Sequence, residues 1–394
     1  MDSKLMLVLV VAITCGHSQV LGDRLETSEI SHKFESDQMS GWEINEYVGI
    51  NALKFNDSIK LPKIKSRTEV LIEVIATSIN PLDQLMTAGY GQRVLNTLRH
   101  LKKIKEFPLI LGREFSGVVK AKGKSVRKNI QVGDKVFGIV PTHQPGSLAE
   151  YVIVDQKTIV RKPENIEDVG ASGIMFAGLT AWSSLYLSGL AGGLRGALTS
   201  RGGGKGLSVC ILGASGGVGT LAVQIAKAEQ MNISATCSTD SVETVKKLGA
   251  GRVIDYRTEN VSEAVRGQFY DIILDAAGLG ADYATSLPWK FSQYITLQPP
   301  LLNDTDSGGI ILGSVKSALT LIKNNVKTIH GKRGLLKWGF FIPAPQGIEY
   351  LRKLVENGQL KPIIDSTYDF NAAKEAFEKV AKGHLRGKVV VKVK

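Results

Sequence analysis

The sequence predicts an α/β protein in which an antiparallel β domain is followed by a domain with a parallel sheet. Short apolar segments broken by Gly, Asp and Pro begin at Trp42, and after about residue 165 apolar runs alternate with helical runs. A glycine-rich turn joins the first of these runs to the helix that follows it. With 394 residues, the chain is long enough to bury the cores of two or more domains.

Residues 1–40 are expected to form a leader and a tether. Lys4 precedes the apolar run LMLVLVVAIT, and small residues near Gly22 suit cleavage, a pattern typical of a secretory signal. An apolar run of about a dozen residues is too short to span a bilayer. A mitochondrial presequence would be amphipathic, rich in Arg and poor in acidic residues, so this segment by itself favours the secretory pathway.

The composition narrows the choice of partners. A net charge of +12 favours anionic partners such as nucleotide phosphates and acidic lipids. We find no zinc-finger spacing, helix-turn-helix signature or aromatic-basic RNA motif, so we expect no nucleic acid as a partner. Cys15, Cys210 and Cys237 are too few for a disulfide framework or a cysteine-rich zinc site.

Turn signals and periodicity place the elements. The strands of the first domain are expected within residues 68–83, 115–123, 132–140 and 148–154. A helical stretch at 169–189 and a glycine-rich basic loop at 189–206 follow. Parallel strands are expected at 209–212, 233–237, 253–256 and 270–278, separated by helices at 217–227, 241–249 and 261–266. The chain ends with helices at 347–359 and 372–383 and a strand at 388–394, which would add to a sheet already begun.

The turn between residues 212 and 217 predicts a dinucleotide site. A helix that starts directly after a strand and glycines points its unpaired N–H groups and positive dipole end outward, which suits a pyrophosphate. Gly213 would allow the tight turn, Gly216 would let the backbone approach the phosphates, and Gly219 would let helix and strand pack closely.

The end of the next strand bears on which dinucleotide binds. An acidic residue there would bind the ribose of NAD and repel an additional phosphate. The sequence has Ser238 and Thr239, whose hydroxyls could donate to a 2′-phosphate, so NADPH is favoured. Nearby cations could add positive charge: Lys246, Lys247 and Arg257. If the strand runs two residues further, Asp240 reaches the ribose position and NADH becomes plausible; otherwise Asp240 is a helix N-cap.

Several motifs together resemble one family. They are NPLD (80–83), LGREFSGVV (111–119), VGDKVFG (132–138), GSLAEYV (146–152), GLTAW (178–182), GASGGVG (213–219), KLGA (247–250), VIDY (253–256) and GHLRGKVVVKV (383–393). Over about residues 42–394 they resemble the zinc-free quinone-oxidoreductase branch of the medium-chain dehydrogenases/reductases. Within that branch, GYGQRVLN, EFPLILGREFSG, YITL, WGFF and GHLRGK look most like the reticulon-4-interacting protein 1 family.

The resemblance implies an architecture and a function. It predicts a GroES-like β-barrel domain at 41–176, a Rossmann doubly wound parallel-sheet domain at 177–339, and a return at 340–394 that completes the first domain. It also implies a mitochondrial NADPH oxidoreductase linked to ubiquinone biosynthesis, with partners from that pathway or a reticulon. Mitochondrion is therefore our expected localisation, against the secretory interpretation of the leader.

The catalytic site is expected to work without metal, because Arg113 stands where zinc-dependent relatives carry a histidine before the glutamate, and Glu114 alone cannot hold zinc. Glu114 is expected to be a buried carboxylate paired with Arg or Lys. Asn80, extended because Pro81 follows, could face the nicotinamide, or could simply be a turn asparagine. Tyr90 could donate a proton, although an aromatic beside glycines more often packs.

The resemblance adds cofactor contacts residue by residue. Ser215, Gly216, Gly217 and Val218 would cradle the pyrophosphate, Ser238 and Tyr256 would contact the adenosine side, and Leu297 and Phe341 would flank the nicotinamide. His384, Leu385 and Arg386 match the family's C-terminal contact; without the match they would be a solvated turn.

Three functions remain open at this point. An NADPH-dependent reductase of quinones or conjugated enones fits best; an NADPH-binding scaffold acting through a protein partner and an enoyl-thioester reductase are the alternatives. The basic stretch at 316–337 has no acidic residue and could contact an anionic membrane surface, but the solvated face of a helix is the favoured interpretation.

Overall fold

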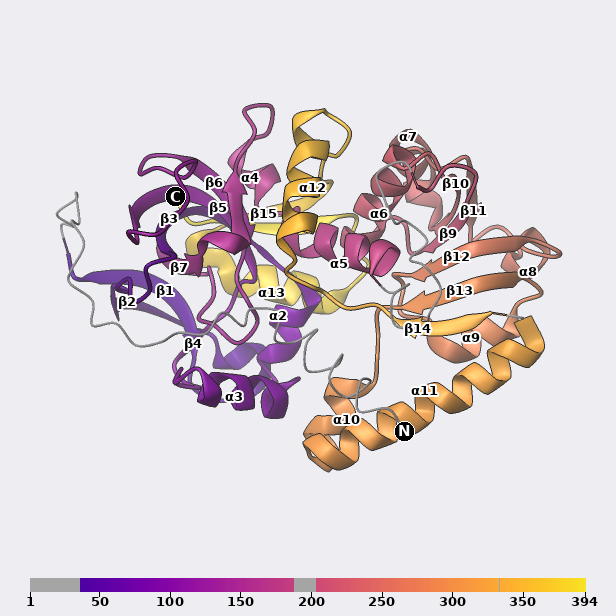
Figure 1. Ribbon diagram of the computed structural model, residues 1–394, viewed down its shortest axis with the longest axis horizontal. Helices are drawn as coiled ribbons and strands as arrows, with labels where there is room; N and C mark the ends of the chain where they lie inside the picture. The colour runs from indigo at the N-terminus through magenta and orange to yellow at the C-terminus, as the bar shows by residue number, and fades with distance from the viewer. Residues whose placement is uncertain (1–35, 188–202, 333) are drawn as a thin grey trace.

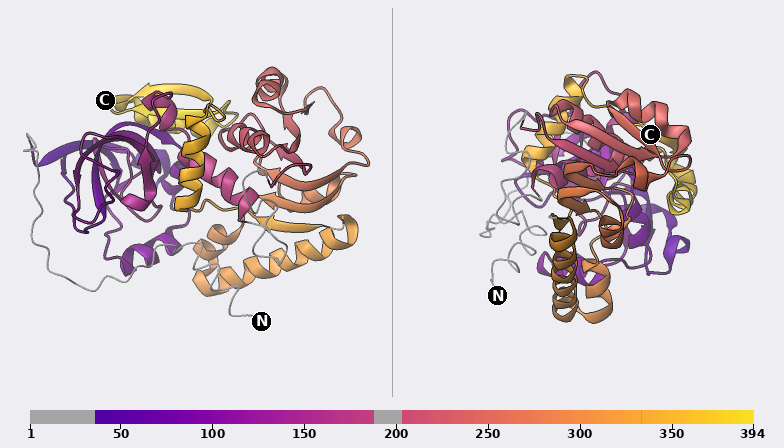
Figure 2. Two further views of the ribbon diagram at one scale, coloured as in Figure 1. Left: turned by 45° about the horizontal axis from the view of Figure 1, so that its top comes forward. Right: turned by 90° about the vertical axis from the view of Figure 1, so that its right-hand side faces the viewer.

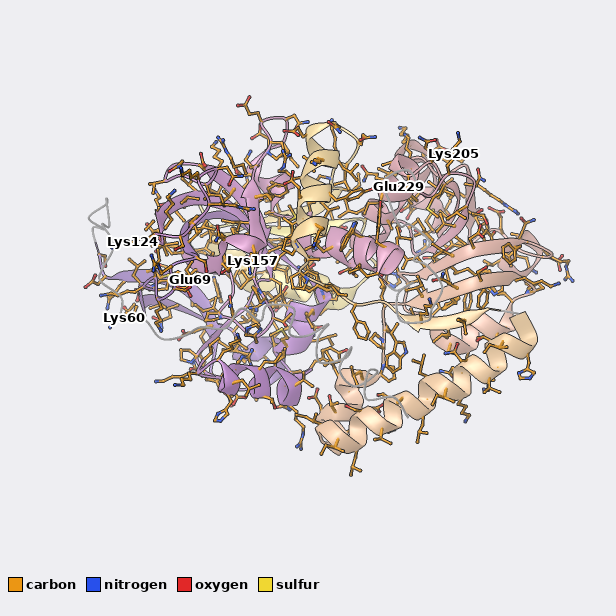
Figure 3. The ribbon with its side chains drawn as sticks, viewed as in Figure 1. Lys60, Glu69, Lys124, Lys157, Lys205 and Glu229 are labelled. Carbon is orange, nitrogen blue, oxygen red and sulfur yellow. The ribbon has the colours of Figure 1, made fainter. Side chains whose placement is uncertain are left out.

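The computed structural model describes residues 36–187, 203–332 and 334–394, arranged as two lobes joined by helices (Figure 1). The leader and most of the glycine-rich loop at 189–206 therefore lie outside the described residues. The β-rich lobe contains the first strands and the C-terminal ones, and the other lobe is built around a parallel sheet (Figure 1). Side chains of Lys60 and Lys124 lie on the β-rich lobe, on the side away from the parallel sheet (Figure 3).

The parallel sheet has the strand order β11-β10-β9-β12-β13-β14. This order has its first strand in the middle and is that of a doubly wound dinucleotide-binding sheet, with the crossover point beside β9. The strands are β9 (Ser208–Leu212), β10 (Asn232–Cys237), β11 (Arg252–Asp255), β12 (Phe269–Asp275), β13 (Lys290–Thr296) and β14 (Leu335–Trp338). The predicted parallel sheet is confirmed.

Helices cover both faces of this sheet. Val209 and Ile211 of β9 belong to a core shared with α5 (Met175–Tyr186), α6 (Gly217–Ala228) and α12 (Pro345–Glu356). Cys210 and Leu212 point to the other core, against α8 (Val261–Ala264), α9 (Gly280–Ser286) and α11 (Ile310–Lys332). Because alternate side chains enter opposite cores, β9 is apolar throughout, as its sequence suggested. The short α7 (Val242–Leu248) follows β10.

The β-rich lobe contains a seven-stranded sheet and a three-stranded sheet. The larger one runs β15-β16-β3-β5-β6-β8, with β7 also paired to β3, and the smaller runs β2-β1-β4. The strands are β1 (Gln38–Ile44), β2 (Lys54–Lys60), β3 (Glu69–Ile79), β4 (Leu109–Ile110), β5 (Glu114–Lys122), β6 (Lys135–Ile139), β7 (Tyr151–Asp155), β8 (Ile159–Arg161), β15 (Ile364–Asp369) and β16 (Lys388–Lys392). Antiparallel pairing of β16 with β3 joins the C-terminal segment to the first lobe.

Short helices complete this lobe. They are α2 (Pro81–Met86), α3 (Gln92–Leu101), α4 (Asp168–Ala171) and α13 (Ala373–Lys382). The single helix expected at 169–189 is two helices, α4 and α5, with Gly173 between them against the Lys388 side chain. The strand expected at 270–278 ends at Asp275, because its carboxylate accepts hydrogen bonds from Leu279 N and Gly280 N and so starts α9.

Two helices lie between β13 and β14. Helix α10 (Leu301–Gly308) reaches across to α3 of the β-rich lobe, and α11 runs along the outer edge of the parallel-sheet lobe (Figure 1). Both views in Figure 2 show α11 projecting beyond the rest of the lobe. Within the described ranges, none of the helices combines the length and the apolar character that crossing a membrane requires.

Candidate active site

The glycine turn after β9 has the geometry expected for a phosphate cradle. Gly213 has φ +74°, a left-handed conformation that favours glycine. A Cβ on Gly219 would lie 2.2 Å from the Gly213 carbonyl oxygen, so this position must stay bare for α6 to pack on β9. A Cβ on Gly216 would meet only that same oxygen, at 3.6 Å, and would otherwise occupy open space. The turn therefore leaves room at Gly216, where a phosphate would approach.

Donors surround this space. Helix α6 begins at Gly217, and its first intrahelical bond is donated by Thr220 N to Gly216 O. The N–H groups of Gly217, Val218 and Gly219 therefore precede any intrahelical acceptor and carry the positive end of the helix dipole. Ser215 lies in the same turn and lines the neighbouring cavity. The residues present fit a pyrophosphate.

A cavity of about 80 Å³ adjoins the turn. It is lined by Ser215, Ser238, Asp240, Tyr256, Arg257, His384, Leu385 and Arg386. Six of these are among the expected cofactor contacts: Ser215 at the pyrophosphate, Ser238 and Tyr256 on the adenosine side, and the C-terminal contact of His384, Leu385 and Arg386 in the loop before β16. His384 adopts φ +51°, between the left-handed Gly383 and Gly387, which bends that loop towards the parallel sheet.

The end of β10 shows whether Asp240 reaches the ribose position, which the sequence left open. Strand β10 ends at Cys237, and Ser238 follows directly as the N-cap of a 3-10 turn, so Asp240 lies in that turn and not at the strand end. The Asp240 carboxylate accepts a 2.5 Å hydrogen bond from the Arg386 guanidinium. The strand extension that would bring Asp240 to the ribose position is therefore absent.

Leu297 and Phe341 lie at the carboxyl edge of the parallel sheet. Leu297 follows β13, and Phe341 follows β14; both pack partly buried against the core shared with α5. The Phe341 ring stacks on Phe176 of α5, with ring centroids 4.2 Å apart and planes inclined by 21°. These apolar walls fit the flanks of a nicotinamide ring, and they lie between the two lobes.

Asn80 belongs to a buried polar network instead of an open surface. Its side chain is 1% exposed, and its amide N donates to Glu114 Oε1 at 3.1 Å while its amide O accepts from the Lys388 ammonium. Lys388 also donates to Glu114 Oε1 at 2.8 Å. The pairing expected for Glu114 is confirmed, with Lys388 as the cation. Asn80 is moreover the N-cap of α2, and its proposed catalytic role stays a prediction.

This network connects the two lobes. Glu114 Oε2 accepts from Phe176 N at 2.9 Å, which fixes the start of α5 and the ring that stacks on Phe341. The stem of Lys388 lies beside the phosphate turn, since a Cβ on Gly217 would be 2.9 Å from Lys388 Cδ. Glu114 and Lys388 thereby link the start of α5 to the phosphate turn. Sequence reasoning missed Lys388, although a cation at the start of the apolar strand KVVVK was a signal.

Tyr90 lies in the turn between α2 and α3, facing α10. Burial, together with the nearby Asp306 carboxylate, raises the pKa of its phenol. Asp306 also accepts from Gly91 N at 2.5 Å and from Arg93 N at 3.1 Å, at the start of α3. The phenol therefore stays protonated at neutral pH beside the contact that joins the lobes. Sequence reasoning did not find Asp306, which is 215 positions from Gly91.

The charged groups around Glu114 are already paired with one another. Arg113, which precedes Glu114, is fully buried, and its guanidinium lies 3.4 Å from Asp83. Burial lowers the pKa of Arg113 to about 10, so it remains a cation at neutral pH. The Glu114 carboxylate already forms an ion pair with the Lys388 ammonium. Over residues 36–187, 203–332 and 334–394, no three His, Cys, Asp or Glu side chains form a group that could hold a metal ion.

Two family models match the chain. Residues 66–164 match the alcohol dehydrogenase GroES-like domain, and residues 248–391 match the zinc-binding dehydrogenase model. A solved structure, the quinone oxidoreductase from Coxiella burnetii, superposes with a TM-score of 0.70 at 26% identity, covering 91% of this chain and 100% of that one. The expected combination of a GroES-like domain and a Rossmann domain is confirmed.

Curated relatives carry the comparison further. The NAD(P)H oxidoreductase RTN4IP1, mitochondrial, of Drosophila melanogaster is 44% identical over 91% of this chain and 87% of its own length. The protein of the same name from Bos taurus is 38% identical over 90% and 89%. These names confirm the mitochondrial localisation expected from the resemblance, while the leader itself lies outside the described residues. The chain thus belongs to the RTN4IP1 family of NAD(P)H oxidoreductases, within the medium-chain dehydrogenases/reductases.

Proposed function

We propose that the protein is an NADPH-dependent reductase that passes a hydride to a quinone or conjugated enone without zinc. The observation that carries the choice of NADPH is the cavity beside β10. Ser238 holds the position where an acidic residue would bind an unphosphorylated ribose, and the Asp240 carboxylate, which lines the same cavity, is paired with the Arg386 guanidinium. A 2′-phosphate in this cavity would meet the Ser238 hydroxyl and two arginines, Arg257 and Arg386, while the charge of the single carboxylate in the lining is balanced by its pairing with Arg386.

The remaining cofactor contacts follow from the same turn and cleft. The N–H groups at the start of α6, with Ser215, hold the pyrophosphate, and Leu297 and Phe341 flank the nicotinamide. When bound, the reduced nicotinamide supplies the hydride. Glu114 and Lys388 keep the start of α5 and the phosphate turn in register, and Asn80 acts here through that network.

Tyr90 is the group we assign to the substrate oxygen. A quinone or enone delocalises the charge that develops on its oxygen, so one hydrogen-bond donor suffices. The raised pKa of Tyr90 keeps its O–H available as that donor. In contrast, Arg113 and Lys388 are committed to buried carboxylates and do not compete for this role.

The relatives support this proposal. Those at 44% and 38% identity are named NAD(P)H oxidoreductases, and the superposed Coxiella protein is named a quinone oxidoreductase. The resemblance extends the proposal to ubiquinone biosynthesis and to protein partners of that pathway or a reticulon. We infer a small-molecule quinone or enone as the substrate.

The test compares NADPH and NADH oxidation with a short-chain ubiquinone and with 9,10-phenanthrenequinone. Ser238→Asp adds a carboxylate at the ribose position and should remove the preference for NADPH. Asn260→Asp is the matched control, because it adds the same charge at the exposed N-cap of α8, where Asp is also a good cap.

Each outcome is decisive. The proposal predicts that the wild type oxidises NADPH when quinone is present. Ser238→Asp should shift the preference towards NADH, and Asn260→Asp should not; this result would support both the reductase activity and the NADPH preference. NADPH binding without turnover of either quinone would replace the reductase by a scaffold that acts through a partner. Equal use of NADH by the wild type would overturn the assignment of the cavity.

A further inference from the structure

Helix α11 carries an exposed apolar stripe that the fold does not use. Leu312 is 72% exposed and Leu319 61%, in a protein whose other large apolar side chains are mostly buried. The stripe consists of Ile311, Leu312, Val315, Leu319, Ile322, Val326 and Ile329. From Leu312 onward, these residues follow one another at alternating steps of three and four, so they share one face of the helix.

The opposite face of α11 is fixed to the body of the lobe. Ser317 is buried and donates to Asp304 of α10 at 2.6 Å, and Asn325 donates to Leu336 O of β14 at 3.0 Å. Leu321 packs partly buried against the core beneath the sheet. These contacts fix the rotation of α11 about its axis, so the stripe faces outward as a rigid part of the structure.

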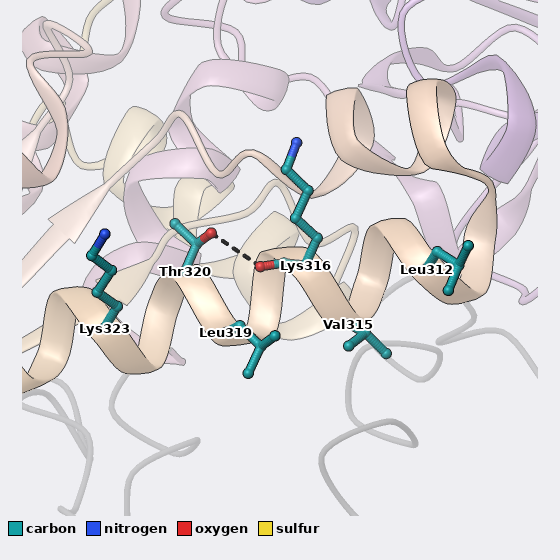
Figure 4. A pocket seen from close by; sticks show the side chains of 6 residues that line it. All are labelled: Leu312, Val315, Lys316, Leu319, Thr320 and Lys323. Carbon is teal, nitrogen blue, oxygen red and sulfur yellow. Dashed lines mark hydrogen bonds between the residues drawn. The ribbon is translucent and has the colours of Figure 1, made fainter.

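Cations flank the stripe on one side. Lys316, Lys323 and Lys327 lie next to it at helical spacing, and residues 309–334 include no acidic residue. Leu312, Val315 and Leu319 point to one side in Figure 4, with Lys316 and Lys323 turned to the other. The side chains of Leu312, Val315, Lys316, Leu319, Thr320 and Lys323 border a shallow groove of about 350 Å³.

We propose that α11 lies on the surface of an anionic phospholipid bilayer, with the apolar stripe in the headgroup boundary. A 23-residue helix presents about 34 Å of length. An apolar face bordered by lysines is the arrangement that binds such surfaces, where acyl chains cover the stripe and lipid phosphates attract the cations. The net charge of +12 adds to that attraction.

Charge favours a bilayer over a second copy of the chain. In an antiparallel pair around a two-fold axis, the same flank of each helix meets its counterpart. Lys323 and Lys327 would then face the lysines of the other copy, and α11 offers no carboxylate to pair with them. An anionic bilayer would cover the apolar stripe with acyl chains and pair the flanking lysines with lipid phosphates.

Binding of α11 to a bilayer would also bring Tyr90 near the membrane; this step rests on the proposed function. Helix α11 follows α10 after Gly309, and Asp306 of α10 binds Gly91, next to Tyr90. A quinone dissolved in the bilayer would therefore meet the protein at the end of α11 that is nearest the cleft. Turnover of a membrane-dissolved quinone then depends on α11, whereas turnover of a water-soluble one does not.

The test measures cosedimentation of the full chain with vesicles, without cofactor or substrate. Vesicles of phosphatidylcholine alone are compared with vesicles that also contain cardiolipin, at low and high salt. Leu319→Ser/Ile322→Ser removes part of the stripe, and Lys323→Gln/Lys327→Gln removes two flanking charges while leaving Lys316 on Asp304. Lys60→Gln/Lys124→Gln is the matched control, because both lysines are exposed on the far lobe (Figure 3).

We expect salt-sensitive binding to cardiolipin vesicles alone. Each lysine near the surface contributes about fivefold to the vesicle affinity, so Lys323→Gln/Lys327→Gln should weaken vesicle binding about 25-fold. The Lys60→Gln/Lys124→Gln control should weaken it by less than about twofold. The serine variant should weaken it at least as much as Lys323→Gln/Lys327→Gln does, with turnover of a short-chain quinone unchanged. Lack of binding by the wild type, or wild-type binding by both α11 variants, overturns the proposal. A wild-type dimer that the serine variant converts to monomer, without vesicle binding, would make the stripe a subunit interface.

Discussion

The Lys388–Glu114 pair offers a quantitative test of what holds the two lobes in register. Lys388→Met removes the ammonium and keeps a side chain of similar length, so packing beside Gly217 is preserved. Glu114 then remains 0% exposed without its cation. It retains three donors, from Ser78, Asn80 and Phe176, which partly compensate.

The expected loss follows from this geometry. Removing one partner of a buried ion pair typically costs 3–5 kcal/mol, and the three remaining donors place Lys388→Met at the lower end, about 3 kcal/mol. Glu114→Gln should cost a similar amount, because it leaves Lys388 buried at 4% exposure. The double variant carries no unpaired charge, so it should be about 3 kcal/mol less destabilised than the sum of the single variants.

The assay is urea unfolding at pH 7, followed by tryptophan fluorescence for all three variants. Lys246→Met is the control, because Lys246 forms an exposed ion pair with Glu243 at 3.3 Å. Such pairs contribute at most about 1 kcal/mol. If Lys388→Met costs no more than Lys246→Met, or if the single losses simply add, the buried pair does not stabilise the fold and the reasoning fails.

Three further predictions concern the cleft. Tyr90→Phe should lower kcat for quinone at least about tenfold, and an unchanged kcat would exclude Tyr90 as the donor. Because burial and Asp306 raise the pKa of Tyr90, wild-type rates should not fall on the alkaline side in the range where an unperturbed tyrosine begins to ionise. Gly216→Val should raise the Kd for NADPH at least about tenfold and leave the melting temperature unchanged. Gly219→Ala should instead destabilise the fold, because its Cβ would lie 2.2 Å from the Gly213 carbonyl oxygen. Fluorescence titration with NADPH and thermal melts distinguish the two effects. Arg386→Ala should reduce the NADPH/NADH ratio of kcat/KM about 10- to 100-fold, and adding Asp240→Asn should restore part of it; no change in the ratio would remove Arg386 from the phosphate site.

Local sequence predicted most of the elements because their signals are local. The strands at 209–212 and 233–237 and the helix at 217–227 match β9, β10 and α6 closely. Departures occurred where a tertiary contact ends or divides an element. Asp275 stops β12 by accepting two N–H groups of the next helix, and Gly173 separates α4 from α5 where Lys388 passes.

The candidate site divides in the same way. The glycine turn could be predicted in detail, since Gly213 is needed for its own positive φ and Gly219 for its close approach to a backbone oxygen six residues earlier. Asn80 could not be placed, because its environment is made by Glu114 and Lys388, which are 34 and 308 positions away. From the sequence, its amide could face the nicotinamide or belong to a turn; in the fold it bonds to Glu114 and Lys388.

By itself, the sequence determined the phosphate turn, the hydroxyl after β10 and the succession of strands and helices along the chain, because spacing along one chain decides which residues follow a strand or start a helix. Only the tertiary structure decided which distant charges meet. Antiparallel pairing of β16 with β3 brings Lys388 to Glu114, and the loop before β16 brings Arg386 to Asp240. It also decided which face of α11 stays uncovered, because burial depends on what packs against a helix and periodicity alone cannot say which side that is.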